Sequence, residues 1–212
     1  MINTCPFIRW PINDTKPKSQ AFIGRGNKES RDYFEAEMPK FVEHFQNVPC
    51  IGVWTLFNEG WGQFDAVRLT KRLRELDKTR LIDSNSGWFD QGEGDFNSRH
   101  IYFRAPKAKS DNKRILFISE FGGFVSQIEG HSLSSKGIHY FKSKDLTEEY
   151  VKTFEKTLLP LIKKEGLCAT VYTQLCDVEG EANGLYSYDR EVCKVGKEKI
   201  RAINEKMRIE ND

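Results

Sequence analysis

Two glutamates, Glu59 and Glu120, each stand where an apolar run rich in β-branched residues changes into a glycine-rich polar segment. The two apolar runs occupy residues 51–57 and 115–119 and have the character of buried strands. A carboxylate at the carboxyl end of a buried strand is held by a rigid element and directed into the mouth of a sheet or barrel. Two such carboxylates are the minimum needed to cleave a glycosidic bond, because one acts as acid and the other as nucleophile or base.

The pattern of apolar residues predicts the elements that must position the two glutamates. Five short apolar runs are expected to be strands, at 50–57, 81–83, 101–103, 115–119 and 169–175. Four apolar stripes at helical spacing predict helices over 34–45, 66–76, 145–165 and 192–207. Pro39 should kink or shorten the first helix, and Asp145, with Glu148 three residues later, should cap the start of the third.

The order of these elements indicates the fold class. Strands that alternate with helices predict parallel βα units, and burial of the strands on both faces explains their unbroken apolar runs. The long connecting segments all follow strands, at 58–62, 86–98, 121–145 and 176–191. Long loops at the carboxyl ends of strands are typical of the active face of a TIM barrel. A doubly wound open sheet is the alternative α/β fold, but no glycine-rich phosphate fingerprint follows any expected strand.

Length, charge and cysteine content restrict the class of protein. The 212 residues suffice for one domain or part of a larger one, with 1–30 as a proline-rich, loop-like segment and 31–212 as the folded part. A net charge of +2 gives no electrostatic basis for binding nucleic acid or a membrane surface. The five cysteines are scattered without metal-ligand spacing, which predicts reduced thiols and a cytoplasmic location. The sequence shows no export signal and no apolar stretch of membrane-spanning length.

Three segments occur in the chain in an order that is typical of one enzyme family. They are Phe57-Asn58-Glu59-Gly60-Trp61-Gly62-Gln63, Ser119-Glu120-Phe121-Gly122-Gly123, and Tyr172-Thr173-Gln174-Leu175-Cys176-Asp177-Val178-Glu179 followed by Asn183-Gly184-Leu185. With them, residues 41–195 resemble the catalytic barrel of glycoside hydrolase family 2, the family of β-galactosidases, β-glucuronidases and β-mannosidases. The resemblance implies that the five expected strands are strands 4 to 8 of a (β/α)8 TIM barrel, which is therefore only partly present. The expected strands at 50–57 and 169–175 would then lie at open edges.

The resemblance also implies a role for individual residues. Glu59 would be the general acid/base and Glu120 the nucleophile that forms a glycosyl-enzyme ester. Asn58 would hydrogen-bond the sugar 2-hydroxyl in the transition state. The Tyr102 hydroxyl would orient the nucleophile, although a core aromatic with a solvated hydroxyl is the ordinary alternative. His100, two residues earlier on the same side of its strand, would contact sugar hydroxyls or serve a structural role.

Four further side chains are candidates for substrate contact. Trp88, in the segment 86–98, and Trp61, beside the acid, could stack on sugar rings, or each could simply pack its own loop. Tyr172 and Gln174 share one face of the last expected strand, where several family members carry a tryptophan that lines the sugar site. This departure leaves the shape of the pocket, and hence the sugar, open.

A metal site is poorly supported by the sequence. His131 and His139 lie in an expected loop, and neither an HxH nor an HExxH motif is present. Some family members bind magnesium or sodium near the site, but the ligands for such an ion are not evident here, and no cofactor is expected. Three acidic residues follow the last expected strand: Asp177, Glu179 and Glu181. They are expected to lie in a solvated loop; contact with sugar hydroxyls is the less favoured alternative.

The sequence therefore predicts part of a retaining β-glycosidase that hydrolyses terminal β-linked sugars, with a β-galactoside as the model substrate. Its expected partners are the carbohydrate and the missing domains or a complementing chain, and a homo-oligomer is a further option. A non-catalytic remnant or complementing subunit is the alternative, and a carbohydrate-binding module is a third possibility, which the pair of glutamates argues against.

Overall fold

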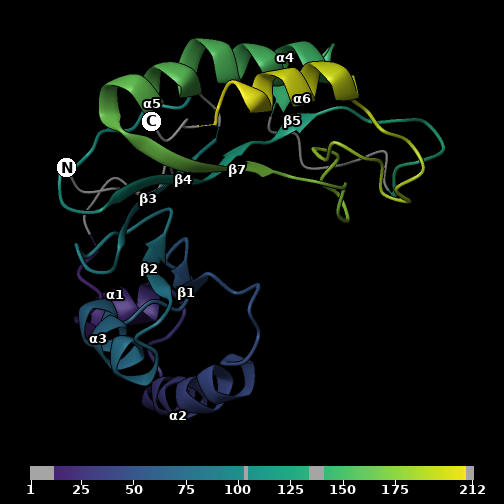
Figure 1. Ribbon diagram of the computed structural model, residues 1–212. Coiled ribbons are helices and arrows are strands. Elements are labelled where there is room, and N and C mark those ends of the chain that lie inside the picture. The colour runs from purple at the N-terminus through teal and green to yellow at the C-terminus, as the bar shows by residue number, and fades with distance from the viewer. Residues whose placement is uncertain (1–11, 103–104, 134–140, 209–212) are drawn as a thin grey trace. The chain divides into compact units, whose positions relative to one another are not determined.

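The computed structural model describes residues 12–102, 105–133 and 141–208 of the protein (Figure 1). Residues 1–11 of the expected N-terminal segment, Phe103 of an expected strand and His139 lie outside the described residues. The chain divides into two compact units, one formed by Met1–His100 with Asp111–Phe117 and the other by Ile101–Ser110 with Ile118–Asp212.

The first unit contains a parallel βα unit. Its elements are α1 (Pro17–Phe22), α2 (Lys28–Phe45), β1 (Val53–Asn58), α3 (Ala66–Leu76), β2 (Leu81–Ser86) and β3 (Phe96–Ile101). β1 and β2 run parallel, with Trp54 opposite Ile82 and Phe57 opposite Asn85. Helix α3 connects these two strands in the sequence and packs on both of them. The crossover predicted from the alternation of apolar periods is confirmed for this pair of strands.

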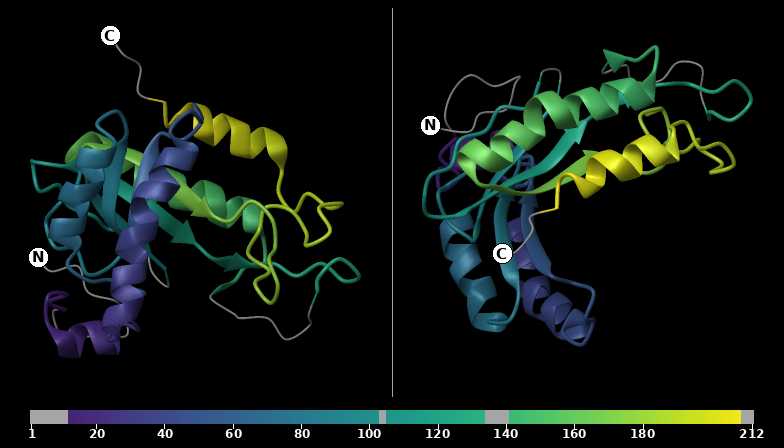
Figure 2. Two further views of the ribbon diagram at one scale, coloured as in Figure 1. Left: turned by 90° about the horizontal axis from the view of Figure 1, so that it is seen from below. Right: turned by 45° about the horizontal axis from the view of Figure 1, so that its top comes forward.

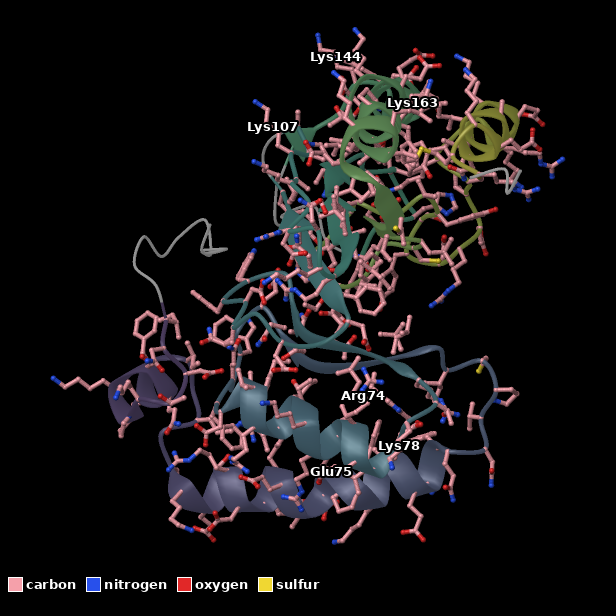
Figure 3. The ribbon with its side chains drawn as sticks, turned by 60° about the vertical axis from the view of Figure 1, so that its left-hand side comes forward. Arg74, Glu75, Lys78, Lys107, Lys144 and Lys163 are labelled. Atoms are coloured by element: carbon pink, nitrogen blue, oxygen red, sulfur yellow. The ribbon has the colours of Figure 1, made fainter. Side chains whose placement is uncertain are left out.

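An apolar core fills the space between the helices and strands of the first unit. Its buried members are Met38, Val42, Trp54, Phe57, Phe64, Ala66, Leu69, Leu73 and Ile82. Ala66, Leu69 and Leu73 lie on one face of α3, at the spacing of helical turns. Glu75 on the same helix and Lys78 just after it, both labelled in Figure 3, are exposed. The amphipathic pattern therefore determines which face of α3 packs against the strands.

The second unit combines short strands with four helical segments. Its elements are β4 (Ile115–Gly122, of which 118–122 belong to this unit), β5 (Phe124–Val125), β6 (Phe141–Lys142), α4 (Leu146–Thr153), the π-helical segment η1 (Phe154–Leu158), α5 (Leu159–Glu165), β7 (Leu167–Thr173) and α6 (Lys197–Glu205). Figure 2 shows α4 beside α6, and the Tyr150 hydroxyl donates to Asn204 Oδ1 across this contact at 3.1 Å. The predicted cap is confirmed, because the Asp145 side chain accepts from Glu148 N at 3.0 Å.

Aromatic rings form the interior of the second unit. The Tyr150 and Phe154 rings stack with centroids 4.3 Å apart, and Tyr172 lies edge-on to Tyr150 at 5.1 Å. Phe121 of β4 contacts both Phe154 and Tyr172 at right-angled geometries that aromatic pairs favour. Gly122 has φ +108°, and a Cβ there would lie 2.6 Å from the Tyr172 ring, so this position requires glycine.

The strands differ from the sequence-based expectation in their bounds. The strand expected at 101–103 is wrong in its bounds, because β3 begins at Phe96, inside the expected loop 86–98, and ends at Ile101. Its sequence, Phe-Asn-Ser-Arg-His-Ile, is too polar to show an apolar run, and yet Asn97 and His100 are buried. β2 continues to Ser86, and β7 lies two residues earlier than expected. β5 and β6 pair in parallel within the segment 121–145, which was expected to be a loop.

The helices also differ in extent. α2 continues through Pro39, because the loss of one backbone hydrogen bond is outweighed by an apolar face on which Met38 and Val42 are buried. α1 falls within the segment 1–30 that was expected to be loop-like. The third expected helix contains the wider turn of η1. α6 begins at Lys197 rather than at 192, because the preceding residues are extended and Cys193 pairs with Tyr186.

The described part of the chain is a mixed α/β structure with small sheets. β1 pairs with β2, and a second sheet has the order β3-β4-β7. β1 and β7 each lie at the end of a sheet, but so do β2 and β3, so the strand orders do not test the open edges expected of an incomplete barrel. The barrel itself stays a prediction.

Leu69→Ala tests the packing of α3 on the parallel strands. Leu69 is completely buried in the core of the first unit, so its truncation should lower the free energy of unfolding by about 2–5 kcal/mol. Urea denaturation followed by circular dichroism measures the change. Val67→Ala on the same helix is the control, because Val67 is exposed and its truncation should change the free energy by no more than about 0.5 kcal/mol. Equal effects of the two substitutions would contradict this packing.

Candidate active site

A tight turn holds Glu59 at the carboxyl end of β1. The strand ends at Asn58, and Glu59 adopts a left-handed backbone conformation with φ +53°. Its N–H donates to the carbonyl of Ser86, the last residue of β2, at 2.9 Å. Gly60 follows with φ +77°, and a Cβ there would lie 2.2 Å from the Phe89 ring. The turn therefore requires glycine and ties the Glu59 backbone to the neighbouring parallel strand.

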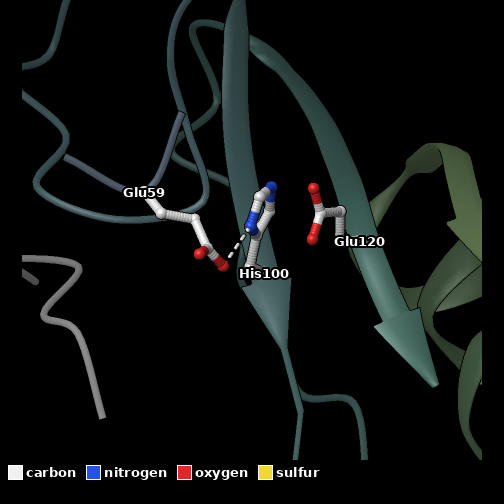
Figure 4. A group of neighbouring side chains, drawn as sticks. All are labelled: Glu59, His100 and Glu120. Atoms are coloured by element: carbon white, nitrogen blue, oxygen red, sulfur yellow. Dashed lines mark hydrogen bonds and ion pairs between the residues drawn. The ribbon is translucent and has the colours of Figure 1, made fainter. Parts of the chain in front are cut away.

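The Glu59 carboxyl is hydrogen-bonded to a buried histidine of β3. Figure 4 shows His100 Nδ1 bonded to Glu59 Oε1 at a distance of 2.8 Å. The other ring nitrogen, Nε2, lies 2.9 Å from Ser86 Oγ. The His100 side chain is 0% exposed and that of Glu59 is 19% exposed, so solvent reaches this pair only at the glutamate side chain. Gly87 leaves room for the ring, since a Cβ there would lie 2.4 Å from it.

The two ring nitrogens of His100 link the protonation of Glu59 to the direction of the hydrogen bond between the ring and Ser86. A neutral imidazole donates from one nitrogen and accepts at the other. When Glu59 is ionised, Nδ1 donates to it; when Glu59 carries a proton, it can donate to Nδ1, and Nε2 then donates to the Ser86 oxygen. Both forms keep the same two contacts, so Glu59 can gain and lose a proton without moving its partners.

Strands β2 and β3 bury an unusual number of polar side chains around His100. The buried polar residues of these strands are Asp83, Ser84, Asn85, Ser86, Asn97, Ser98 and His100. Asp83 is the acidic member of this group and is 1% exposed. Burial raises the pKa of the Asp83 carboxyl to about 6, and the hydroxyls of Ser98 and Ser86 and the charge of His100 oppose this rise.

The other candidates of the first unit differ in their surroundings. Asn58 is exposed at the end of β1, next to Glu59. Trp61 is 74% exposed, as an aromatic platform for a ligand must be. Trp88 is half-buried, packs against the apolar cluster that contains Phe89, and lies edge-on to the His100 ring with centroids 6.4 Å apart. Trp88 thus has a packing role, and its contact with substrate stays a prediction.

In the second unit, Glu120 is hydrogen-bonded to a tyrosine hydroxyl. Glu120 lies inside β4, two residues before its end, rather than at the end as expected. The Tyr102 hydroxyl donates to Glu120 Oε2 at 2.5 Å and lies 2.9 Å from Thr173 Oγ1, whose own proton can be donated to the tyrosine oxygen. Glu120 is half-buried and also appears in Figure 4 on its strand. Glu59 belongs to the first unit and Glu120 to the second, so the separation of their carboxyls stays a prediction.

Tyr172 and Gln174 are engaged in the interior of the second unit. The Tyr172 ring is part of the aromatic core, burial raises the pKa of its phenol, and its hydroxyl donates to Asn183 O at 3.3 Å. Gln174 lies beyond the end of β7, and its Nε2 donates to Asn183 Oδ1 at 2.8 Å. Asn183 in turn donates to Glu181 Oε2 at 3.2 Å. These contacts shape the segment after β7.

The expectation of a solvated acidic loop after β7 is wrong for Asp177. Its side chain is 2% exposed and forms an ion pair with the fully buried Lys194 ammonium at 2.7 Å. The same ammonium donates to the carbonyls of Ser126 and Ala182, and Asp177 Oδ1 accepts from Gly184 N. Burial lowers the pKa of Lys194, and the charge of Asp177 opposes that effect. The spacing of three acidic residues did not reveal this contact, because its partner lies 17 residues later.

One group of side chains in the second unit has metal-ligand chemistry. His131 Nδ1 lies 2.6 Å from Asp189 Oδ2 and 3.9 Å from Glu191 Oε2. The ion pair and the Ser187 hydroxyl lower the pKa of Asp189 to about 2, with the hydroxyl as the larger cause. All three side chains are partly or largely exposed, and the His131–Asp189 ion pair accounts for their proximity.

Sequence reasoning missed several partners of the candidate catalytic residues. Ser86, Asp83 and Thr173 contact or surround them and were not identified as site residues. The signal for the first two was the run Asp-Ser-Asn-Ser in a segment that begins as an apolar strand. Buried polar residues in a strand require partners, and a catalytic network is one source of them.

Solved structures with a fold similar to that of this chain are those of glycosidases. The chain is similar to a β-D-glucuronidase from Dictyoglomus thermophilum, with a TM-score of 0.59, 15% identity, and coverage of 88% of this chain and 37% of that one. It is similar to a GH2 β-galacturonidase from Eisenbergiella tayi, with a TM-score of 0.58, 14% identity, and coverage of 93% and 40%. It is also similar to an FMN-binding β-glucuronidase from Faecalibacterium prausnitzii, with a TM-score of 0.55, 22% identity, and coverage of 80% of this chain and 31% of that one. The chain has the fold of part of such an enzyme.

The predicted resemblance to glycoside hydrolase family 2 is thereby confirmed at the level of the fold. The chain spans between 31% and 40% of the length of these three structures. Neither the family models nor the curated proteins that were compared with the sequence give a match. Among the helices that the structure describes, none combines the length and the apolar character needed to cross a bilayer.

Lys194→Met tests the buried ion pair that anchors the segment after β7. The substitution leaves the Asp177 carboxylate buried without its cation, so the free energy of unfolding should fall by about 3–5 kcal/mol. Urea denaturation of the whole protein measures it. Lys199→Met is the matched control, because the Lys199–Glu148 pair is exposed and should contribute no more than about 1 kcal/mol. An unchanged stability of Lys194→Met would contradict the buried pair.

Proposed function

We propose that the protein is part of a retaining β-glycosidase that hydrolyses terminal β-linked sugars by double displacement. The observation that carries the proposal is the contrast between two hydrogen bonds: Glu59 is bonded to an imidazole, and Glu120 to a hydroxyl. A retaining glycosidase needs one carboxyl that exchanges a proton and one that stays ionised to attack carbon. The partners of the two glutamates match these two requirements.

Glu59 is suited to the exchange of protons. In the first step the glycosidic C–O bond breaks, and the Glu59 proton passes to the leaving oxygen. In the second step Glu59, now ionised, takes a proton from water as the water oxygen bonds to the anomeric carbon. His100 supports both states, because its Nδ1 can accept from the protonated carboxyl or donate to the ionised one.

Glu120 is suited to nucleophilic attack. The Tyr102 hydroxyl can donate a hydrogen bond to the carboxylate, which stabilises its ionised form and fixes the direction of one oxygen. The carboxylate attacks the anomeric carbon to form the glycosyl ester, and it is released when water displaces it. Asn58, exposed beside the acid, is placed to contact a sugar hydroxyl, and exposed Trp61 offers a face for a sugar ring.

The substrate is a β-linked sugar, with a β-galactoside as the model. The similar structures include β-glucuronidases and a β-galacturonidase, which supports a β-glycoside of the hexose or hexuronic acid type. The strands of this chain would form strands 4 to 8 of a TIM barrel, and the remainder of the barrel would complete the sugar site. A non-catalytic or complementing chain of such an enzyme is the second candidate, because only 31–40% of the length of these structures is matched.

Substitution of the two glutamates tests the assignment. Glu120→Gln should abolish hydrolysis of aryl β-glycosides, because an amide does not form the ester. Glu59→Gln should slow substrates with poor leaving groups by about 10²–10⁴-fold and spare those with very acidic leaving groups, which need no proton. Rates on phenyl and dinitrophenyl β-galactosides, β-glucuronides and β-galacturonides measure both effects, with phenol as the poor leaving group.

The exposed Glu37→Gln on α2 is the control and should leave all rates unchanged. A wild-type protein without hydrolysis on any of these substrates would favour the non-catalytic candidate. Equal losses on good and poor leaving groups in Glu59→Gln would contradict its role as the acid.

A further inference from the structure

A cavity in the second unit has no part in the proposed reaction. It has a volume of about 420 Å³ and lies between α6 and the segment 185–195 that precedes this helix. Its lining includes neither Glu120 nor the residues that contact the Glu120 carboxyl. Ligand sites in proteins have volumes of about 300–1,000 Å³, so the cavity suits a small organic molecule. A single inorganic anion would leave most of it unfilled.

The half-buried side chains of the cavity form a largely apolar surface. They are Leu185, Tyr186, Cys193, Val195 and Ile200. Tyr186 contributes an aromatic ring, and Lys197 Nζ lies 5.8 Å from the centroid of that ring, which is the arrangement of a cation–π contact. A planar apolar group can therefore pack in this part of the cavity.

Three exposed cations surround the apolar surface: Lys197, Arg201 and Arg208. Lys197 and Arg201 are four residues apart on α6, so they lie on one side of the helix, about 6 Å apart along its axis. This spacing allows both to contact one anionic group. The carboxylate of Glu205 also lines the cavity, and an excess of positive charge remains.

These cations are not neutralised by the rest of the unit. Lys199, on another side of α6, is paired with Glu148 of α4. By contrast, Lys197, Arg201 and Arg208 form no ion pair with any residue that the structure describes. A guanidinium group can bind a carboxylate, sulfonate or phosphate through two parallel hydrogen bonds. The cavity therefore offers charged donors to an anion beside an apolar surface.

Contacts outside the cavity hold both of its walls in place. The wall formed by the segment 185–195 contains Lys194, whose buried ammonium pairs with Asp177. The wall formed by α6 is fixed to α4, because the Tyr150 hydroxyl donates to Asn204 Oδ1. Since Asn204 also lines the cavity, its Nδ2 can donate to a ligand there. A cavity with fixed walls binds a ligand without the entropic cost of ordering them.

We propose that this cavity binds an organic anion that combines a negatively charged group with a planar apolar body. The charged group contacts Lys197 and Arg201, and the apolar body packs against the Tyr186 ring and Ile200. Both parts are required, because an inorganic anion makes no apolar contact and a neutral ring does not use the cations. The proposal goes beyond the glycosidase proposal and does not depend on it.

Binding of 8-anilinonaphthalene-1-sulfonate to the whole protein tests the site. This probe carries a sulfonate on linked aromatic rings. N-phenyl-1-naphthylamine has the same rings without the charge, and inorganic sulfate has the charge without the rings. Fluorescence titration of the two aromatic probes and calorimetry with sulfate should show that the sulfonate binds about tenfold tighter, or more, than either of the others. Equal affinities for the sulfonate and the neutral amine would overturn the proposal.

Substitutions of exposed residues on α6 assign the binding to this cavity. Arg201→Gln removes a cation from the cavity and should weaken sulfonate binding by about tenfold or more. Lys199→Gln is the matched control, because it removes the same charge from the same helix outside the cavity and should change the affinity by less than about twofold. Glu205→Gln removes the carboxylate from the cavity and should strengthen binding.

Equal weakening by Arg201→Gln and Lys199→Gln would overturn the proposal, because it would reflect net charge alone. Unchanged binding in both Arg201→Gln and Glu205→Gln would also overturn it, because the probe would then occupy another apolar surface. Glu120→Gln should bind the sulfonate as the wild type does, whatever its effect on hydrolysis. Failure of the anion site and failure of the proposed function are therefore distinguishable.

Discussion

The complete burial of the His100 side chain is the constraint on which the candidate site of the first unit depends. A buried imidazole is stable only when its ring nitrogens have hydrogen-bond partners, and Ser86 and Glu59 supply them. If the Glu59 carboxyl rotated away, a buried nitrogen would be left unpaired at a cost of about 1–3 kcal/mol. The core of the unit thereby fixes the direction of a carboxyl that solvent can still reach. Gly60 and Gly87 allow the close approach that this requires.

The second unit fixes Glu120 by a different interaction. Tyr102 donates to the carboxylate from one side, and Thr173 of β7 supports the tyrosine oxygen. A hydroxyl donor favours the ionised carboxyl, whereas an imidazole serves both protonation states. The two glutamates therefore resemble each other in sequence context but differ in the chemistry that their surroundings permit. Lys194 and Asp177 add a buried charge pair that holds the segment after β7 against the rest of the unit.

The sequence predicted the features that depend on apolar periodicity. α3, the parallel pairing of β1 with β2 and the cap at Asp145 follow from patterns that span a few neighbouring residues. The course of β3 was not predictable in this way, because its residues are polar and buried His100 has its partners in Ser86 of β2 and in Glu59, which follows β1. Long-range pairs such as Lys194 with Asp177 leave no local signal at all.

The candidate site was likewise predictable only where local motifs identify its residues. Glu59, Glu120, Tyr102 and His100 were identified from strand-end motifs and from the resemblance that they carry. The structure shows hydrogen bonds from His100 to Glu59 and from Tyr102 to Glu120, and the catalytic roles of these residues stay predictions. The contact of Ser86 with Nε2 of the imidazole could not be predicted, because a serine at the end of a strand has many ordinary uses.

Trapping of the glycosyl ester tests the central claim most directly. A 2-deoxy-2-fluoro-β-glycoside with a dinitrophenyl leaving group should react with the whole protein, because the fluorine slows both steps while the leaving group keeps the first one feasible. Mass spectrometry of a peptic digest should then place the sugar on the peptide that contains Glu120, and Glu120→Gln should remain unlabelled. A label on any other residue, or the absence of a label on the wild type, would contradict the account.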